Sequence, residues 1–151
     1  MKTPERPDAM SIEHQELHKE LTAATKAGGQ TADTAKDVMK VLFPHMLHEE
    51  EFAIPPLKLL PALARGEFDP DIKRVLMKTE RLKAELPRML DEHKLIVHAL
   101  RKLLHAAMSE HHARYARLAQ KLILHAQMEE EFLYPASILV GEYIKLRLGR
   151  P

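Results

Sequence analysis

The segment HMLHEEEFAIP, residues 45–55, is followed 80 residues later by a second copy, HAQMEEEFLYP, residues 125–135. Six of the eleven positions are identical, and in each copy they include a His and a Glu four residues apart. Residues with this spacing lie on one face of an α-helix, one turn from each other. An imidazole and a carboxylate so placed have the spacing of metal ligands, and this pair occurs twice.

A further His precedes each copy. The segments IEH, residues 12–14, and DEH, residues 91–93, stand in equivalent positions, with their His residues 79 positions apart. A nearly constant offset predicts two helical hairpins of the same design, each with a His on one helix and a His and a Glu on the next. The candidate metal ligands are therefore His14, His45, Glu49, His93, His125 and Glu129.

The composition limits what such a site can hold. The 151 residues include no Cys, which excludes an iron–sulfur cluster or a thiolate zinc site held by this chain. Imidazole and carboxylate ligands suit iron, manganese or zinc. Ten His residues, against three Tyr and no Trp, favour a chemical role for some of the imidazoles.

The charge balance and the hydropathy indicate which partners to expect. Lys and Arg number 23 and Asp and Glu 22, so a net charge of +1 predicts no nucleic-acid partner. The first residues lack the apolar core of a secretory signal, and no apolar run approaches the roughly 20 residues that span a bilayer. We expect a soluble, cytoplasmic protein with no membrane partner, and the sequence identifies no protein partner.

Apolar periodicity predicts one all-α domain over residues 10–148, preceded by a flexible N-terminal arm over residues 1–9. The signals of strands, which are period-two alternation and hairpin-turn dipeptides, are absent. Four main helices with short connections favour an up-down-up-down four-helix bundle, in which residues at matching heights converge on the axis. The expected helices cover about 10–27, from an N-cap at Thr31 or Asp33 to a break at Pro55, about 88–108, and from near Ser109 to a break at Pro135.

One amphipathic segment has no counterpart in the duplication. Residues 72–82 carry an apolar stripe, and Pro87 is expected to kink the chain or to split this segment from the third main helix. The predicted bundle therefore has an extra helical segment between its two hairpins.

Both candidate Glu ligands fall on stripes that are otherwise apolar. A buried carboxylate is unfavourable unless it is paired or bound to a metal, so Glu49 and Glu129 are hard to explain as packing. The following residues, Glu50 and Glu130, lie about 100° further round the helix and are expected on a solvated face.

Other His and Met residues are weaker candidates. His18 and His98 each lie about a turn from a proposed ligand, and three interpretations stay open: a fifth ligand, a hydrogen-bond partner of a ligand, or a surface residue. Surface or helix-end positions are expected for His105, His111 and His112. Buried positions are expected for Met89, Met128 and Phe132.

The order His, His-x3-Glu, His, His-x3-Glu resembles that of the hemerythrin-like family, with its HHE cation-binding domain, over about residues 10–147. The resemblance implies a four-helix bundle around a non-haem di-iron site, with two Fe ions bridged by an oxo or hydroxo group and by Glu49 and Glu129. Open coordination positions would take O2, NO or peroxide. The terminal imidazoles would come from His14, His45, His93 and His125.

The chain departs from the oxygen-carrying hemerythrins at two positions. Those proteins have a second His in helix three where this chain has Val97, and an aspartate five residues after the helix-four His, where this chain has Glu129 at four. The His-poorer set is similar to that of bacterial HHE relatives and argues against reversible oxygen carriage. The Glu-x-x-His motif of ferritin-like di-iron proteins does not occur in the sequence.

Three functions stay open on the sequence, and with them whether the protein is an enzyme. The leading prediction is a non-haem di-iron protein that binds O2 or NO for sensing, storage or delivery. The alternative is a stress-response redox enzyme that decomposes peroxide, or an iron donor for the repair of iron–sulfur clusters, with Tyr134 or Tyr115 near the site. In the third, the bundle binds zinc or no metal and serves as an interaction module.

Overall fold

The computed structural model describes residues 9–69 and 72–149. The predicted arm over residues 1–9 lies outside these residues except for Ala9, the first residue of α1. The described chain is helical almost throughout and contains no strand, which confirms the all-α prediction. None of the described helices is both long and apolar enough to cross a lipid bilayer.

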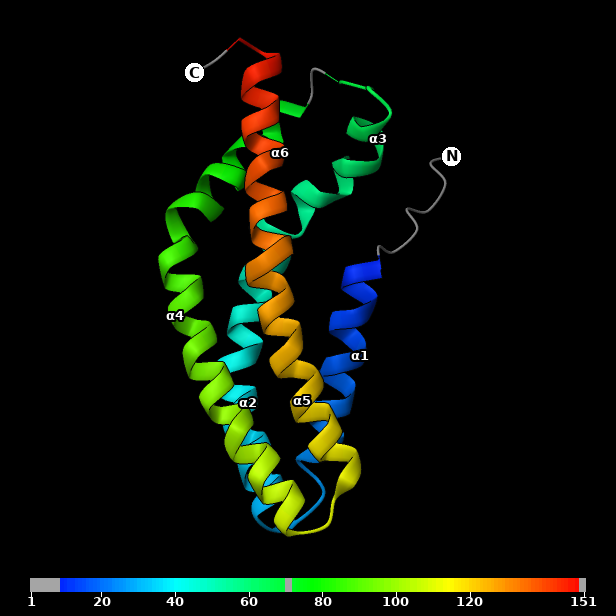
Figure 1. Cartoon of the computed structure of the whole chain (residues 1–151), viewed down its shortest axis with the longest axis vertical. Helices are drawn as coiled ribbons and strands as arrows, with labels where there is room; N and C mark the ends of the chain where they lie inside the picture. The colour runs from blue at the N-terminus through cyan, green and yellow to red at the C-terminus, as the bar shows by residue number, and fades with distance from the viewer. Residues whose placement is uncertain (1–8, 70–71, 150–151) are drawn as a thin grey trace.

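Four main helices form a bundle (Figure 1). They are α1 (Ala9–Ala24), α2 (Gly29–His48), α4 (Lys73–Ser109) and α5 (Ala113–Met128). Helix α4 packs against both α2 and α5, and α1 packs against the same two helices. The remaining elements extend α2 and α5 toward the other end of the molecule: η1 (Glu49–Ala53), η2 (Pro55–Leu59), α3 (Leu60–Ala64), η4 (Glu129–Leu133) and α6 (Tyr134–Arg147).

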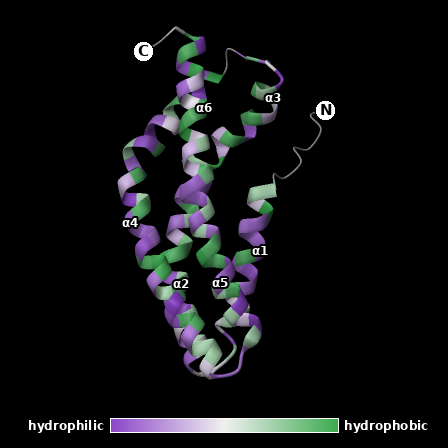
Figure 2. Cartoon of the chain, in the orientation of Figure 1, coloured by the Kyte–Doolittle hydropathy of each residue, from purple (hydrophilic) through white to green (hydrophobic). Residues whose placement is uncertain are grey.

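Apolar side chains form two main cores along the bundle, separated by a polar layer. The lower core in the view of Figure 1 includes Leu21, Leu100 and Leu122, and the upper core includes Phe52 and Leu82. Figure 2 shows apolar and polar residues alternating along the helices, the pattern of amphipathic helices. The candidate ligands lie between these cores, with Met89 of the upper core and Ile96 of the lower core on either side of His93.

The N-terminus of α2 is capped from a distant part of the chain. The sequence predicted Thr31 or Asp33 as the cap, and this prediction is wrong, because the N-cap is Gly28, at a φ of 80° that favours glycine. The carboxylate of Glu110, at the end of α4, accepts hydrogen bonds from the backbone N–H groups of Gln30 at 3.1 Å and Thr31 at 2.6 Å. A negative charge at a helix N-terminus is favourable, so this contact fastens the end of α4 to the start of α2.

Helix α4 runs without a break through Pro87. The predicted split is therefore wrong, and the expected extra segment is the N-terminal part of the helix that carries His93. Pro87 is exposed, so its ring faces solvent, whereas Leu82 and Met89 on either side are fully buried in the upper core. We attribute the continuity to this burial, which offsets the roughly 3 kcal/mol that a proline costs inside a helix.

Helix α6 lies very close to the N-terminal part of α4. A Cβ atom added at Gly141 would overlap the side-chain hydroxyl of Thr79, which is buried between the two helices. Glycine at this position therefore permits the close approach that holds the middle of α6 against α4.

Candidate metal centre

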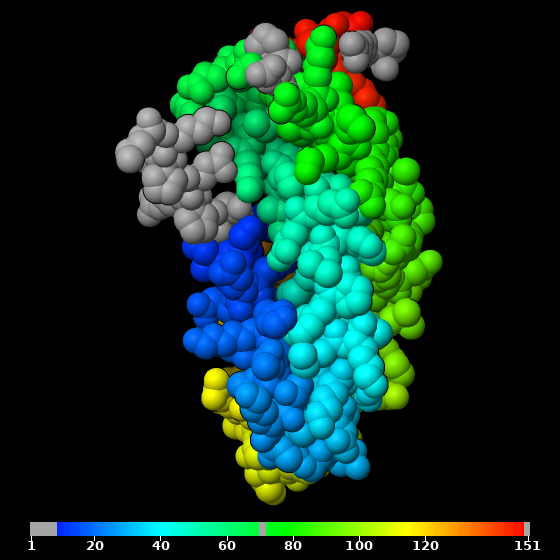
Figure 3. Space-filling model, turned by 180° about the vertical axis from the view of Figure 1, so that it is seen from behind, coloured from blue at the N-terminus to red at the C-terminus, as the bar shows by residue number. Residues whose placement is uncertain are grey.

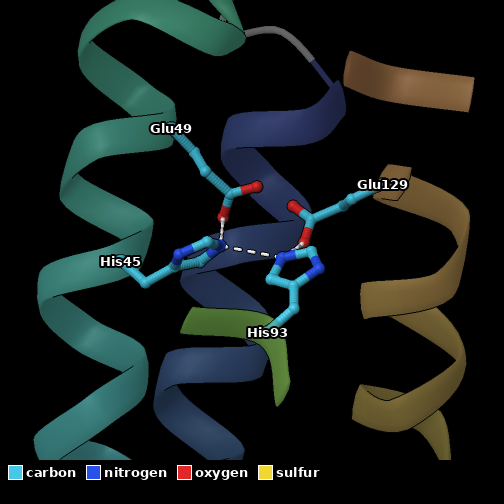
Figure 4. A group of neighbouring side chains, drawn as sticks. All are labelled: His45, Glu49, His93 and Glu129. Atoms are coloured by element: carbon cyan, nitrogen blue, oxygen red, sulfur yellow. Dashed lines mark hydrogen bonds and ion pairs between the residues drawn. The ribbon is translucent and has the colours of Figure 1, made fainter. Parts of the chain in front are cut away.

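The structure brings all six predicted site residues together in the polar layer, in two groups. The first group is His45, Glu49, His93 and Glu129, and the second group is His14, His125 and Glu129. Within each group, one potential ligand atom per residue lies within 4.8 Å of all the others. Figure 4 shows the side chains of the first group pointing toward one another from α2, η1, α4 and η4. Four of the six residues are at most 2% exposed.

Glu129 belongs to both groups. One carboxylate oxygen, Oε1, lies 3.3 Å from Nε2 of His93, and the other, Oε2, lies 3.3 Å from Nε2 of His125 and 3.8 Å from Nε2 of His14. Glu49 belongs to the first group alone and lies 3.5 Å from Nε2 of His45. The resemblance implied two bridging carboxylates, and the geometry places one, Glu129, between the groups.

Both of these Glu residues begin a π-helical turn that is set by the duplicated proline. Pro55 lacks the N–H that would bond to the carbonyl of Glu51, and in an α-helix its ring would clash with that carbonyl. The chain widens instead, so that the N–H of Ile54 bonds to the carbonyl of Glu49 at 2.8 Å, and Lys78 Nζ donates to the freed carbonyl of Glu51 at 2.9 Å. The second copy repeats the turn before Pro135. Such turns are frequent at functional sites.

Each of the four imidazoles has a carboxylate beside its outer nitrogen, Nδ1. At His45, His93 and His125 this contact is a hydrogen bond, and because an ionised carboxylate can only accept one, Nδ1 of each ring carries a proton and Nε2 points into the centre. This fixed orientation is typical of metal-binding His residues. Nδ1 of His14 has no hydrogen-bond partner among the described residues. The Nδ1–carboxylate distances are 2.7 Å for His45–Glu92, 3.0 Å for His93–Glu130, 2.9 Å for His125–Glu13 and 3.7 Å for His14–Glu50.

These carboxylates are the functional residues that the sequence reasoning missed. Glu50 and Glu130 were expected on a solvated face, and both are exposed, but the carboxylate of each also lies beside a candidate ligand. The π-helical turn shifts the helical register and so places both carboxylates beside the imidazoles. For Glu13 and Glu92 a signal was present, because a Glu directly precedes the first His of each repeat.

A tyrosine completes the first group. The hydroxyl of Tyr134, which is fully buried, donates to Oε2 of Glu49 at 2.9 Å and lies 3.0 Å from Nε2 of both His45 and His93. Burial and the neighbouring carboxylates raise the pKa of Tyr134 far above its usual value. In the second group, no hydroxyl of the described residues bonds to Nε2 of His14 or Nε2 of His125.

The two ligand groups contain too few hydrogen-bond donors to satisfy their buried acceptor atoms. In the first group, Nε2 of His45 and Nε2 of His93 face each other at 2.9 Å, and the one hydroxyl nearby points to Glu49. In the second group, Nε2 of His14, Nε2 of His125 and Oε2 of Glu129 have no hydrogen-bond partner within residues 9–69 and 72–149. Each buried unpaired polar atom costs about 1–3 kcal/mol. A cation in each group would satisfy these atoms, and the nitrogen and oxygen donors fit a first-row metal ion.

The pKa values of the two central carboxylates are shifted in opposite directions. Burial and the adjacent Glu129 raise the pKa of Glu49 well above its usual value. Burial also opposes the charge on Glu129, but its contacts with Glu49 and three His residues hold the pKa of Glu129 well below its usual value. Burial lowers the pKa of His45 and so keeps this imidazole neutral. A metal ion would therefore replace protons when it binds.

The weaker candidates lie outside both groups. His18 is exposed and stacks on Phe43 at 4.0 Å between ring centroids, and His98 is exposed beside a separate cavity lined by Arg101 and Lys102. The predicted burial of Met89 is confirmed. The predicted burial of Met128 and Phe132 is wrong, because their side chains are 50% and 60% exposed. His112 is the N-cap of α5, and His105 and His111 are exposed, as predicted.

The second group borders two openings. An apolar pocket of about 410 Å³ is lined by His125, Glu129, Leu124, Met128 and Phe132 among others. A second hollow, of about 510 Å³, lies between α1 and α2 and is lined by His14, His18 and Phe43, among others. Figure 3 shows α1 and α2 side by side on this face of the molecule, with a hollow between them.

The chain is thus an all-helical bundle with buried His and carboxylate groups that can hold metal. No protein-family model, curated protein or solved structure matches it.

Proposed function

We propose that the chain is a hemerythrin-like, up-down-up-down four-helix bundle that binds one iron ion in each ligand group and takes up O2 or NO at this di-iron site. One observation carries the proposal: two groups of buried, inward-facing donor atoms meet at a single shared carboxylate, Glu129. Packing alone does not account for this set, because several of its polar atoms have no hydrogen-bond partner.

Different residues would have different roles in holding such a centre. The four Nε2 atoms supply the nitrogen donors, and the carboxylates at Nδ1 of His45, His93 and His125 fix the orientations of these three rings. Glu129 joins the groups, and the two apolar cores exclude water from above and below. When bound, the iron ions supply open coordination positions and a change of oxidation state.

The apolar pocket beside the second group favours O2 or NO as the small ligand. Its lining is mostly aliphatic and aromatic, with Leu57, Leu60 and Phe132 around His125. Small uncharged gases partition into such surroundings, whereas anions lose hydration there. Sensing, storage and delivery all use this binding step.

The test is the iron content per chain after anaerobic loading with ferrous iron, followed by absorption spectra on addition of O2 or NO. We expect two irons per chain and new charge-transfer bands. A His125→Ala variant should lose the gas response, and His105→Ala, an exposed His outside both groups, should keep it. Less than one iron per chain in the unmodified protein would overturn the proposal.

A control for catalysis uses hydrogen peroxide. Multiple turnovers of peroxide by the iron-loaded protein, without a stable response to O2 or NO, would favour the redox-enzyme alternative. Release of iron to a chelator at a rate that exceeds gas binding would favour an iron donor.

A further inference from the structure

The phenol of Tyr134 occupies a position that a hydrogen bond alone does not explain. Its oxygen lies 3.0 Å from Nε2 of His45, 3.0 Å from Nε2 of His93 and 2.9 Å from Oε2 of Glu49. It has one proton to share among these three acceptors, so two of the three contacts lack a hydrogen. The oxygen is therefore positioned like a metal-ligand atom beside the two Nε2 atoms and the Glu49 carboxylate.

The distances match those between ligands of one metal ion. Donor atoms bound at about 2.1 Å in an octahedral arrangement stand about 3.0 Å apart along each edge. The two imidazole Nε2 atoms are 2.9 Å apart, and the phenol oxygen is 3.0 Å from each of them. These three atoms thus have the spacing of one triangular face of an octahedron.

The duplication places this phenol in one group only. Eighty residues before Tyr134, and likewise directly before a proline, the first copy has Ile54. The first group therefore gains an oxygen donor that the second group lacks among the described residues.

We propose that Tyr134 is itself a metal ligand, and that it binds through its phenolate oxygen to the ion held by His45 and His93. On binding, the phenol O–H bond breaks, an oxygen–metal bond forms, and the proton leaves to solvent water, with no change of oxidation state. The first group then has five protein donors, while the second group, beside the apolar pocket, keeps its open positions for the small ligand. This inference rests on the proposed metal centre.

Resonance Raman and visible absorption of the air-oxidised, iron-loaded protein test the assignment. We expect phenolate ring modes, enhanced in a phenolate-to-ferric charge-transfer band, in the unmodified protein and their complete loss in Tyr134→Phe. Tyr115→Phe and Tyr143→Phe are matched controls and should keep the signal, because Tyr115 packs against His112 and the hydroxyl of Tyr143 accepts a hydrogen bond from Arg147, away from both groups. Tyr134→Phe should still bind iron in both groups.

A second measurement on the unmodified protein does not depend on the folding of any variant. Ultraviolet difference spectra during titration with Zn²⁺, which has no redox chemistry, should show ionisation of one of the three tyrosines.

The outcomes separate this inference from the proposed function. Iron bound in both groups without phenolate modes, or zinc bound without tyrosine ionisation, would make Tyr134 a hydrogen-bond donor only and overturn the inference. A protein that binds no iron would overturn the proposed function, and the inference with it.

Discussion

The two ligand groups come from a duplicated sequence, yet they differ in closure and in donor set. The first group contains a phenol, and His45, Glu49 and His93 are at most 2% exposed. The second group has no phenol, and the side chain of His125 is 13% exposed beside an apolar pocket. The shared positions of the repeat thus supply two similar sets of ligands, of which one is closed and the other open.

Equivalent phenylalanines show the same difference in packing. Phe52 is 2% exposed, with the guanidinium of Arg81 over its ring at 4.7 Å, whereas Phe132 is 60% exposed and lines the pocket. The N-terminal part of α4 packs against the first wide turn. Coverage by α4 therefore closes the first group on the side where the second group stays open.

Removal of the central carboxylates, one at a time, should produce the largest changes in metal binding and should distinguish the two groups. Glu129→Ala should abolish metal binding in both groups, because Glu129 belongs to both, and Glu49→Ala should abolish it in the first group alone. Iron content per chain measures this, with Glu131→Ala, an exposed neighbour, as the control. Equal losses in the Glu49 and Glu129 variants would contradict the assignment of a single shared carboxylate.

The carboxylates behind the imidazoles should matter unequally. Glu92→Ala should weaken metal binding in the first group by roughly 10–100-fold, the usual effect of losing a hydrogen-bond partner of a ligand. Glu13→Ala should have a smaller effect in the second group, because Glu13 is 50% exposed against 23% for Glu92, and water can replace it more easily.

Chelator competition with Zn²⁺ gives both affinities. The control is Glu85→Ala, which removes a carboxylate that pairs with Arg88 on the surface of α4. Equal weakening by the Glu92 and Glu13 changes would show that burial does not distinguish the two groups.

Filling the pocket tests which group takes the small ligand. Met128→Trp should slow NO association with the reduced, iron-loaded protein by roughly tenfold, which corresponds to about 1.4 kcal/mol of added barrier. Stopped-flow absorption measures the rate, and Met77→Trp, at a 79% exposed position outside the pocket, is the control. An unchanged rate for Met128→Trp would indicate entry through the hollow between α1 and α2.

The smallest effect is expected far from both groups, at the cap of α2. Hydrogen bonds from the side chain and N–H of Thr31 and from the N–H of Gln30 lower the pKa of Glu110 below 4.5. Its stabilising contribution is therefore fully present above pH 4.5 and is lost as the pH falls through the lowered value.

Denaturant unfolding as a function of pH measures this contribution. The difference in unfolding free energy between the unmodified protein and Glu110→Gln should shrink below pH 4.5, while metal binding in the two groups at neutral pH stays the same. A difference that is constant with pH would show that Glu110 does not act through its charge.

The sequence predicted the helical fold and the convergence of six residues because both depend on local periodicity and on a repeated motif. That these residues bind metal stays a prediction. The sequence did not reveal the cap of α2, because Glu110 is 79 residues from Thr31. It did not reveal the continuity of α4 either, because burial on both sides of Pro87 overrides the local tendency of proline to interrupt a helix. Phe132 was misplaced because its exposure depends on which helix covers it, which local periodicity does not contain: the equivalent Phe52 lies in the same kind of turn and is buried.

The crossed pairing of imidazoles and carboxylates bears on how such a chain could arise. Two pairs, His14–Glu50 and His93–Glu130, form within a hairpin, and the other two, His45–Glu92 and His125–Glu13, join one hairpin to the other. A single hairpin that carried only the shared residues would hold every partner it needs, provided that it met an identical copy about a two-fold axis. Gene fusion of such a dimer would preserve all the pairs and would then free one copy to acquire a phenol and the other an opening.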